Sequence, residues 1–407
     1  MRSRLWINVV VASALLVSAG CWWAQPGAGP GNTFANFETH LTVDNVATLE
    51  QAWSGRGGLS AVVNGVVVGA YWTGTGVDVV AHDFTTGDET WSRTLTPPGV
   101  VSGFPTHAPV VTGSTVWTGY VARTATATCA FGLARLDLAT GSLLGTDTSY
   151  APTELVPFGG KVAMAGGVYS PVLDMCIPPF SDPLRVVDAA TGTTEWMSGG
   201  IDSGHRITQV GDAIYLSTAG LRRYAAAGCG ASTCNPIWSS QATGTGSINT
   251  LAGERSGPLF ALAPITFGQT GLFTIDPATG TPLASTPLAF HASSLAVADH
   301  MVFVAGTTGV AAYDAASCAA GSCVLLWSAA TGGQVTWANG LAVAGGVVYV
   351  GREDGVVEAY AESGCGAPTC SPVTSLSTGG TVLQLAVAQG QLLVGTLDTV
   401  TAFAPTG

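Results

Sequence analysis

The stretch AHDFTTGDETW, residues Ala81–Trp91, decides the fold of this chain because its spacing returns at Val186–Trp196. In both places an aspartate is followed by a glycine and then by a tryptophan at equal intervals. The aspartate can accept hydrogen bonds from the next turn, the glycine can adopt a left-handed conformation, and the tryptophan offers a flat packing surface. The residues concerned are Asp83, Gly87 and Trp91 in the first copy and Asp188, Gly192 and Trp196 in the second.

A second recurring piece, an alternating run around a tight turn, precedes the copies. Val62–Val68 reads VVNGVVV, and Val343–Tyr349 reads VAGGVVY. Asn-Gly and Gly-Gly between apolar runs favour hairpins, because such turns need positive φ. We therefore predict repeats of four strands, at the spacing of about 40–50 residues that is typical of propeller blades. Their centres are Asp83, Asp137, Asp188, Ala225, Asp276, Asp314, Ala361 and Ala404.

The last copy stops after its third strand, and the missing strand is available near the other end of the chain. Residues Leu49–Trp53 read as an isolated fourth strand that carries its tryptophan. We expect this strand to complete the last unit, because an open ring would expose two sheet edges. The predicted fold is an all-β, eight-bladed β-propeller whose last blade is closed by the N-terminal strand. A seven-bladed ring is the alternative, if one worn copy is not a blade.

The first residues have the features of an export signal. Arg2 and Arg4 precede an apolar run that is short for a membrane span, and small residues then lead to Cys21. This end resembles a bacterial lipobox, in which the cysteine is lipidated. We expect residues 1–20 to be a signal peptide, 21–36 a lipidated cysteine with a flexible tether, and 37–407 the propeller. The alternative is ordinary secretion without a lipid on Cys21.

The cysteines also indicate an oxidising compartment. Nine cysteines minus Cys21 leave an even number, and six of these form Cys-x4-Cys pairs. Zinc is the rival interpretation, but zinc spacings are shorter and the pairs lie in different repeats. The last two cysteines precede third strands in adjacent repeats and can join two loops, although two free thiols would look the same. The predicted disulfides are Cys229–Cys234, Cys318–Cys323, Cys365–Cys370 and Cys129–Cys176.

Composition limits the partners. The net charge is −12, from 25 acidic and 13 basic residues, which excludes the basic surface that nucleic acids require. The hydrophobic content of 47% argues against disorder. We expect a monomer that binds an envelope protein or ligand and attaches to a membrane through Cys21.

The Ala-x-Asp-x3-Gly-x3-Trp spacing resembles the repeat of PQQ-like (quinoprotein-like) propellers, and Ala81–Trp91 matches it throughout. One branch of that family contains dehydrogenases that use PQQ and calcium. The other contains non-catalytic propellers, including the lipoprotein of the bacterial outer-membrane assembly machine. No Cys-Cys pair, which many of the alcohol-oxidising enzymes carry, occurs here. The resemblance implies a non-catalytic scaffold without cofactor or metal; a PQQ- or metal-dependent dehydrogenase and a carbohydrate-binding propeller are the alternatives.

Two places on the ring are candidate binding sites. Aligned repeats put polar residues at one register before the first strand, where they could bind a ligand or an ion, or simply line a wet channel mouth. These are His107, His205 and Asn339, with Thr153, Thr250 and Ser293. Insertions at 71–78, 121–132 and 168–182 should crowd one face. Their aromatic residues, which could contact a partner or pack on the loops, are Trp72, Tyr120, Tyr169 and Phe180. Asp299-His300 is expected to be a solvated hairpin turn.

Overall fold

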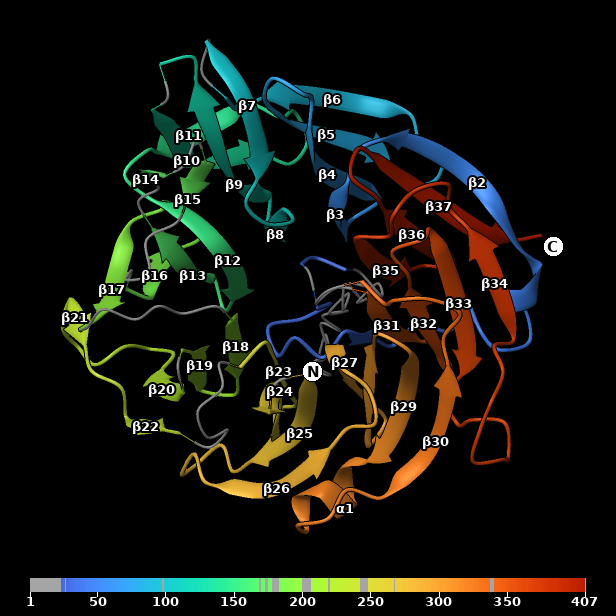
Figure 1. The fold of residues 1–407 in the computed structure, drawn as a ribbon. Coiled ribbons are helices and arrows are strands. Elements are labelled where there is room, and N and C mark those ends of the chain that lie inside the picture. The colour runs from blue at the N-terminus through green and yellow to red at the C-terminus, as the bar shows by residue number, and fades with distance from the viewer. Residues whose placement is uncertain are drawn as a thin grey trace, which may run out of the picture.

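Alternating apolar runs around glycine turns produce strands throughout the described chain, and these strands form eight blades around a central channel and one separate two-stranded sheet (Figure 1). The computed structural model describes residues 23–25, 27–96, 99–126, 128–167, 170–172, 175–177, 183–199, 206–218, 220–241, 248–266, 268–336 and 340–406. Short helices are α1 (Ala315–Ala319) and the 3-10 turn η1 (Val46–Thr48). Within those ranges no helix is long and apolar enough to cross a membrane.

Each blade is an antiparallel sheet whose first strand lies nearest to the channel. Blade 1 contains β3 (Leu59–Val63), β4 (Val66–Trp72), β5 (Val77–Asp83) and β6 (Glu89–Thr94). Blade 2 contains β7 (Val100–Pro105), β8 (Val110–Thr112), β9 (Thr115–Thr124), β10 (Cys129–Asp137) and β11 (Leu143–Asp147). Blade 3 contains β12 (Ala151–Phe158), β13 (Lys161–Gly167), β16 (Arg185–Asp188) and β17 (Thr194–Ser198), with the separate hairpin β14 (Ser170–Val172) and β15 (Met175–Ile177). Blade 4 contains β18 (Arg206–Val210), β19 (Ala213–Ser217), β20 (Leu221–Ala225) and β22 (Trp238–Ser240).

The second half of the ring repeats this order. Blade 5 contains β23 (Thr250–Gly253), β24 (Leu259–Thr266), β25 (Gln269–Ile275) and β26 (Pro282–Pro287). Blade 6 contains β27 (Ala292–Ala298), β28 (Met301–Gly306), β29 (Gly309–Asp314) and β30 (Leu325–Ala330). Blade 7 contains β31 (Leu341–Ala344), β32 (Val347–Gly351), β33 (Val356–Ala361) and β34 (Thr374–Ser377), and β1 (Ala35–Asn36) runs parallel to β31. Blade 8 contains β35 (Gln384–Ala388), β36 (Gln391–Gly395), β37 (Thr399–Pro405) and β2 (Leu49–Arg56).

Blade 8 confirms the predicted closure of the ring. Strand β2 pairs antiparallel with β37, with Glu50 opposite Ala404 and Trp53 opposite Ala402. The two strands lie side by side although they come from opposite ends of the chain (Figure 1). The ring therefore has eight blades, and the seven-bladed alternative is wrong.

The repeated glycine and tryptophan form the contact between neighbouring blades. Gly141 has φ +66°, and a Cβ built there would lie 2.5 Å from the Trp91 ring of the preceding blade. The same contact joins Gly87 to Trp53, at 2.7 Å. Trp53 also donates a hydrogen bond of 3.0 Å from Nε1 to the carbonyl oxygen of Phe84. Glycine is needed here both for the left-handed turn and for the space that the ring occupies.

The repeated aspartates order the turn as predicted. Asp83 accepts hydrogen bonds from the backbone N–H groups of Thr85 and Thr86, both 2.9 Å long. Asp188 accepts the equivalent bonds from Ala190 and Thr191. These bonds hold the pKa of each carboxyl below its ordinary value, because they stabilise the charged form.

All four expected disulfides are present, so the described cysteines are paired with one another rather than with zinc. The loop of Cys229–Cys234 reaches back to blade 3, where β21 (Thr233–Cys234) pairs parallel with β17. Cys370 likewise donates its backbone N–H to Ser328 in blade 6. In these two cases the stapled loop therefore forms backbone hydrogen bonds with the outer strand of the preceding blade.

The segment before β2 corrects one prediction, because it is not a flexible tether. Residues 23–25 and 27–45, here called the N-terminal plug, lie within the ring of blades (Figure 1). Trp23 is fully buried and exchanges two backbone hydrogen bonds with Val62. Carbonyl oxygens of the plug accept hydrogen bonds from first strands around the ring: Ala24 from Val111, Pro30 from Gln209, Gly31 from Gly253, Thr33 from Val297 and Phe34 from Val343.

The N-terminal plug binds along the channel because of the free edges of the first strands. Each first strand has one neighbour in its blade, so its channel edge keeps backbone groups that need partners. A segment rich in glycine and proline can follow the curved wall and pair with them. The bonded positions lie near the ends of the first strands, beside the turns into the second strands. We call this end of the channel the turn end, and the opposite end, where the insertions leave the second strands, the insertion end.

Candidate functional site

The predicted polar ring belongs to the insertion end, and the described residues do not assemble it. His205 and Asn339 lie outside the described residues. His107 Nδ1 lies 2.6 Å from the carbonyl oxygen of Ala108, and its Nε2 has no partner. Burial lowers the pKa of His107 to about 4, so the imidazole is neutral at physiological pH. One neutral imidazole against its own backbone does not make an ion site.

Other polar residues of the first strands, including Thr250 of the predicted register, join neighbouring blades. Thr250 donates a hydrogen bond of 3.2 Å from its hydroxyl to the carbonyl oxygen of Ser293. Thr208 donates one of 3.0 Å to the carbonyl oxygen of Leu251. Both bonds cross from one first strand to the next, so these hydroxyls hold the inner ring together and are not available to a ligand.

The described aromatic residues of the insertions differ in their exposure. Trp72 is exposed and lines an apolar cavity of about 310 Å³ with Phe104 and Leu397. Tyr120 is buried, while Tyr169 and Phe180 lie outside the described residues. The Cys129–Cys176 disulfide links the insertions of blades 2 and 3.

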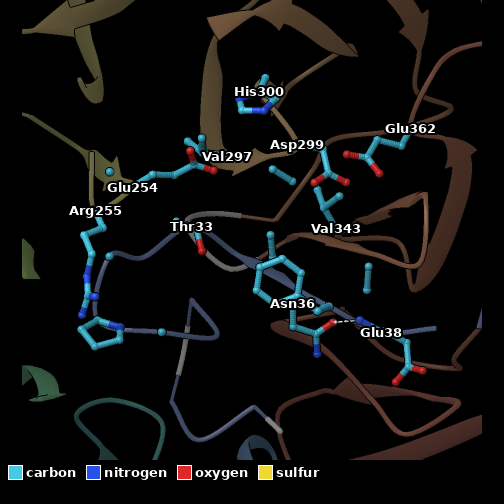
Figure 2. A pocket seen from close by; sticks show the side chains of 18 of the residues that line it. Thr33, Asn36, Glu38, Glu254, Arg255, Val297, Asp299, His300, Val343 and Glu362 are labelled. Carbon is cyan, nitrogen blue, oxygen red and sulfur yellow. Dashed lines mark hydrogen bonds between the residues drawn. The ribbon is translucent and has the colours of Figure 1, made fainter. Parts of the chain in front are cut away.

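The turn end holds a larger pocket, which the sequence did not point to. Its volume is about 940 Å³, and it lies between the N-terminal plug and the first-to-second-strand turns of blades 4 to 7 (Figure 2). Main-chain atoms and small side chains of glycine, alanine and valine form much of the wall. The charged residues that line it are Glu38, Glu254, Arg255, Asp299, His300 and Glu362.

Glu362 is the buried charge of this pocket. It follows β33 and is only 6% exposed, yet its Oε1 has no hydrogen-bond partner. Burial, together with the nearby charge of Asp299, raises the pKa of Glu362 to about 7. Figure 2 shows these two carboxyl groups on the same side of the pocket. An unpaired buried carboxyl is costly, because desolvation disfavours its charged form.

Two other acids of the pocket, Glu38 and Asp299, differ from Glu362 in their surroundings. Glu38 is buried, but its Oε1 accepts hydrogen bonds from the backbone of Thr39 and His40, and its Oε2 accepts one from Gly390. These bonds keep the pKa of Glu38 below its ordinary value despite burial. Asp299 is exposed on the pocket rim, in the predicted hairpin turn.

The turn before β28 has an unusual backbone. Asp299 has φ +43° and His300 has φ +66°, which is the left-handed region that glycine normally occupies. Equivalent turns use Asn64-Gly65 in blade 1 and Gly345-Gly346 in blade 7. Blade 6 therefore places a carboxylate and an imidazole on the pocket rim at the expense of backbone strain.

The described lining of the turn-end pocket includes carboxylates, one arginine, one histidine and small or apolar residues. Among the described residues, no group of three or more histidine, cysteine, aspartate or glutamate side chains is arranged to hold a metal ion. The described part of the pocket lining contains no cysteine, tyrosine or lysine. What it offers is a preformed cavity with an acidic side, formed by Glu362 and Asp299, and a basic residue, Arg255, across from them (Figure 2).

These elements together form an eight-bladed β-propeller whose channel holds the N-terminal plug. Among solved structures, the chain is similar to the quinohemoprotein alcohol dehydrogenase of Comamonas testosteroni, with a TM-score of 0.66, 14% identity, and coverage of 95% of this chain and 82% of that one. It is also similar to BamB of Moraxella catarrhalis, with a TM-score of 0.59, 17% identity, and coverage of 88% and 98%. A europium-containing methanol dehydrogenase gives a TM-score of 0.66 at 12% identity, with coverage of 94% and 98%. No protein-family model and no curated protein sequence matches the chain. At these identities the likeness establishes the fold, which enzymes and other proteins share.

Proposed function

We propose that this protein is an exported, lipid-anchored, non-catalytic propeller that binds an envelope ligand, either a small molecule or a segment of a partner protein, in the turn-end pocket. The observation that carries the proposal is the pocket of about 940 Å³ that contains the unpaired, buried Glu362. Pockets of this size that are largely preformed and carry a few placed polar groups are typical ligand sites. The closed ring of blades supplies the rigid frame.

A quinoprotein dehydrogenase is the alternative, because two of the similar structures are alcohol-oxidising enzymes. The quinone PQQ is anionic and needs cationic partners. The turn-end pocket offers Glu362, Asp299 and Glu254 on its walls against one arginine, Arg255. Its residues therefore do not fit the anionic quinone, and they support no catalytic step through that group. Sugar binding by the insertion aromatics stays a prediction for a glycan array.

The disulfides support an extracytoplasmic location, because such bonds persist in oxidising compartments. The anchor is part of the proposal. Cys21 is two residues from Trp23, so the Cα atom of the lipidated residue would lie within about 7 Å of the Cα atom of Trp23. Trp23 bonds to Val62 at the end of β3. An anchor there would hold the turn end, and with it the pocket, against the membrane.

Ligand binding in the pocket can be tested by placing a large side chain at its entrance. Ser256 is exposed on the pocket lining, whereas Ser114 is exposed on the turn of blade 2 and does not line the pocket. We expect a small-molecule and peptide extract of the cell envelope to raise the Tm of the wild-type protein and of Ser114→Trp but not of Ser256→Trp. No stabilisation of the wild type, or equal stabilisation of both variants, would refute binding at this pocket.

Two further measurements test the remaining parts of the proposal. Mass spectrometry of the protein from membranes should find a diacylglyceryl group on Cys21, and its absence refutes the anchor. Dye-linked oxidation of alcohols or sugars after addition of PQQ and calcium would refute the non-catalytic assignment. The anchor and the pocket can fail separately, because each has its own readout.

A further inference from the structure

The repeat shows that Glu362 is not required by the fold. The residue after the motif aspartate or its substitute is apolar in the other blades, and in blades 1, 2, 3, 4 and 6 its backbone N–H donates to the first-to-second-strand turn. Glu362 makes the same backbone contacts: its N–H donates to Gly346, and its carbonyl oxygen accepts from Trp327 Nε1 at 2.9 Å. The side chain adds nothing to these contacts. The equivalent residues are Phe84, Leu138, Ala189, Ala226, Pro277, Ala315 and Pro405.

A second buried glutamate in the same strand provides an internal comparison. Glu358 is 5% exposed, and both of its oxygens have partners. Its Oε1 accepts from Arg352 Nη1 at 2.5 Å and from the Gly332 N–H at 3.1 Å, and its Oε2 accepts from the Tyr360 hydroxyl at 2.7 Å. Glu358 therefore shows how this fold satisfies a structural carboxylate. Glu362 lies four residues further on and lacks such a donor at Oε1, although it lines an open pocket.

The ionised form of Glu362 needs a hydrogen-bond donor as its partner, and the surrounding charges favour a positive one. Asp299 acts on Glu362 as a like charge, so an anion near this pair would be repelled. Arg255 lies on the other side of the pocket and does not neutralise the pair (Figure 2). A cationic N–H donor placed between the two carboxylates would form charge-assisted hydrogen bonds to both.

The size of the pocket identifies the kind of cation. A volume of about 940 Å³ is far larger than a single ion needs, and the described residues contain no cluster that could hold a metal. The lining also includes Val210, Val297, Val343 and the exposed residue Phe37. Such a wall suits a carbon skeleton. The arrangement resembles sites in which one end of an organic ligand is charged and the rest is apolar.

We infer that the turn-end pocket binds an organic cation, a primary ammonium or guanidinium group on an apolar skeleton, with Glu362 and Asp299 as its counter-ions. This inference rests on the proposed function and specifies its ligand. The chemistry is shared by free polyamines and by lysine or arginine side chains of a peptide. Binding selects the ionised form of Glu362, so a proton is released when the ligand binds below pH 7.

The test uses spermidine, a lysine-containing tripeptide and an arginine-containing tripeptide as probes, with citrate as the anionic control. Isothermal titration of the full-length protein at pH 6 and pH 8 should show tighter cation binding at pH 8, by up to about tenfold. Glu362→Gln should weaken binding at pH 8 at least tenfold and remove most of the pH dependence. Glu50→Gln, which changes an exposed acid of β2 that does not line the pocket, should alter the affinity less than threefold. Thermal unfolding of each variant confirms that it is folded.

The pH dependence is assigned to Glu362 by comparison of variants, because other titratable groups face the pocket. They are Asp299 and His300 on the turn before β28, Glu254 and Arg255 on the turn after β23, and Glu38 on the plug. Equal affinity of Glu362→Gln and wild type, or an unchanged pH profile in that variant, overturns the inference. Preference for free spermidine indicates a polyamine, and preference for a tripeptide indicates a basic peptide segment.

Failure of the inference and failure of the proposed function give different results. If the cations do not bind but an envelope extract still stabilises the wild type and not Ser256→Trp, the pocket binds a ligand of another class. If neither cations nor extract bind, the proposed function fails with the inference.

Discussion

Replacement of Glu362 by glutamine should stabilise the protein at pH 8 and leave its stability at pH 5 nearly unchanged. The pKa of Glu362 is raised from 4.5 to about 7 in the folded protein. A shift of this size corresponds to about 3 kcal/mol at about 1.4 kcal/mol per unit. This value is an upper bound, because water in the pocket screens the charge. We expect a gain of about 1–3 kcal/mol at pH 8, or about 2–4 °C in Tm at most for a chain of this size.

The direction in which the stability changes with pH follows from how many protons the folded and unfolded states bind. Between pH 4.5 and 7 the folded carboxyl holds a proton that the unfolded one has lost, so this group favours folding at low pH. That contribution is lost as the pH rises through 7, because the buried carboxyl must then ionise without a donor. Glutamine keeps the shape and does not ionise, so its advantage over glutamate grows as the pH rises from 4.5 to 7 and is nearly constant above pH 7.

Thermal and urea unfolding at pH 5 and pH 8 measure the difference. The matched control is Glu358→Gln, which removes the charge of a glutamate bound by Arg352 and Tyr360. We expect this control to be destabilised at both pH values, because it breaks a satisfied pair. The reasoning is refuted if Glu362→Gln is less stable than wild type at pH 8, or if its effect is the same at both pH values.

Three further changes test the ring. Trp53→Ala removes the tryptophan of the closing strand, which is 7% exposed, and should cost about 3–5 kcal/mol in urea unfolding; a loss below about 1 kcal/mol would contradict its role in closure. Gly141→Ala should lower the unfolding free energy clearly more than Gly113→Ala. Both glycines have positive φ, but an added Cβ would meet a tryptophan ring only at Gly141. Equal losses of about 1 kcal/mol for the two variants would show that the contact with the ring does not matter. Cys129→Ser opens the bond to Cys176, which closes a separation of 47 residues, and should lower the unfolding free energy by up to about 4 kcal/mol; unfolding equal to that of the wild type would show that the bond is not formed in solution.

The ring was predictable from the sequence because its determinants are local and repeated. Asp83, Gly87 and Trp91 specify one turn and one contact between blades, and their spacing identifies a blade without any knowledge of its neighbours. Closure followed from counting strands, since Leu49–Trp53 had no partner until the last blade was found one strand short. The cysteine spacing was similarly local and predicted the disulfides.

The plug and the pocket were not predicted, for different physical reasons. The plug is held by backbone hydrogen bonds to strands distant in sequence, and main-chain bonds leave no side-chain pattern. Its glycines and prolines, such as Gly31 and Pro30, are also typical of flexible segments, so the composition does not distinguish the two. The signal for Glu362 was present: alignment of the repeats places a glutamate after Ala361, where the other copies have an apolar residue. That signal requires the copies to be compared at a position outside the motif itself.

The closing strand also has a consequence for how the chain acquires its structure. Strand β2 precedes almost all of the propeller in sequence, yet its sheet partner β37 lies more than 300 residues later. During vectorial synthesis or translocation, β2 therefore has no sheet partner until β37 emerges, by which time the strands of the first seven blades have already been made. Interruption of the chain at any earlier point leaves an arc with two adhesive sides in place of a ring. The ring therefore has no exposed sheet edge only after β37 has been made and has paired with β2.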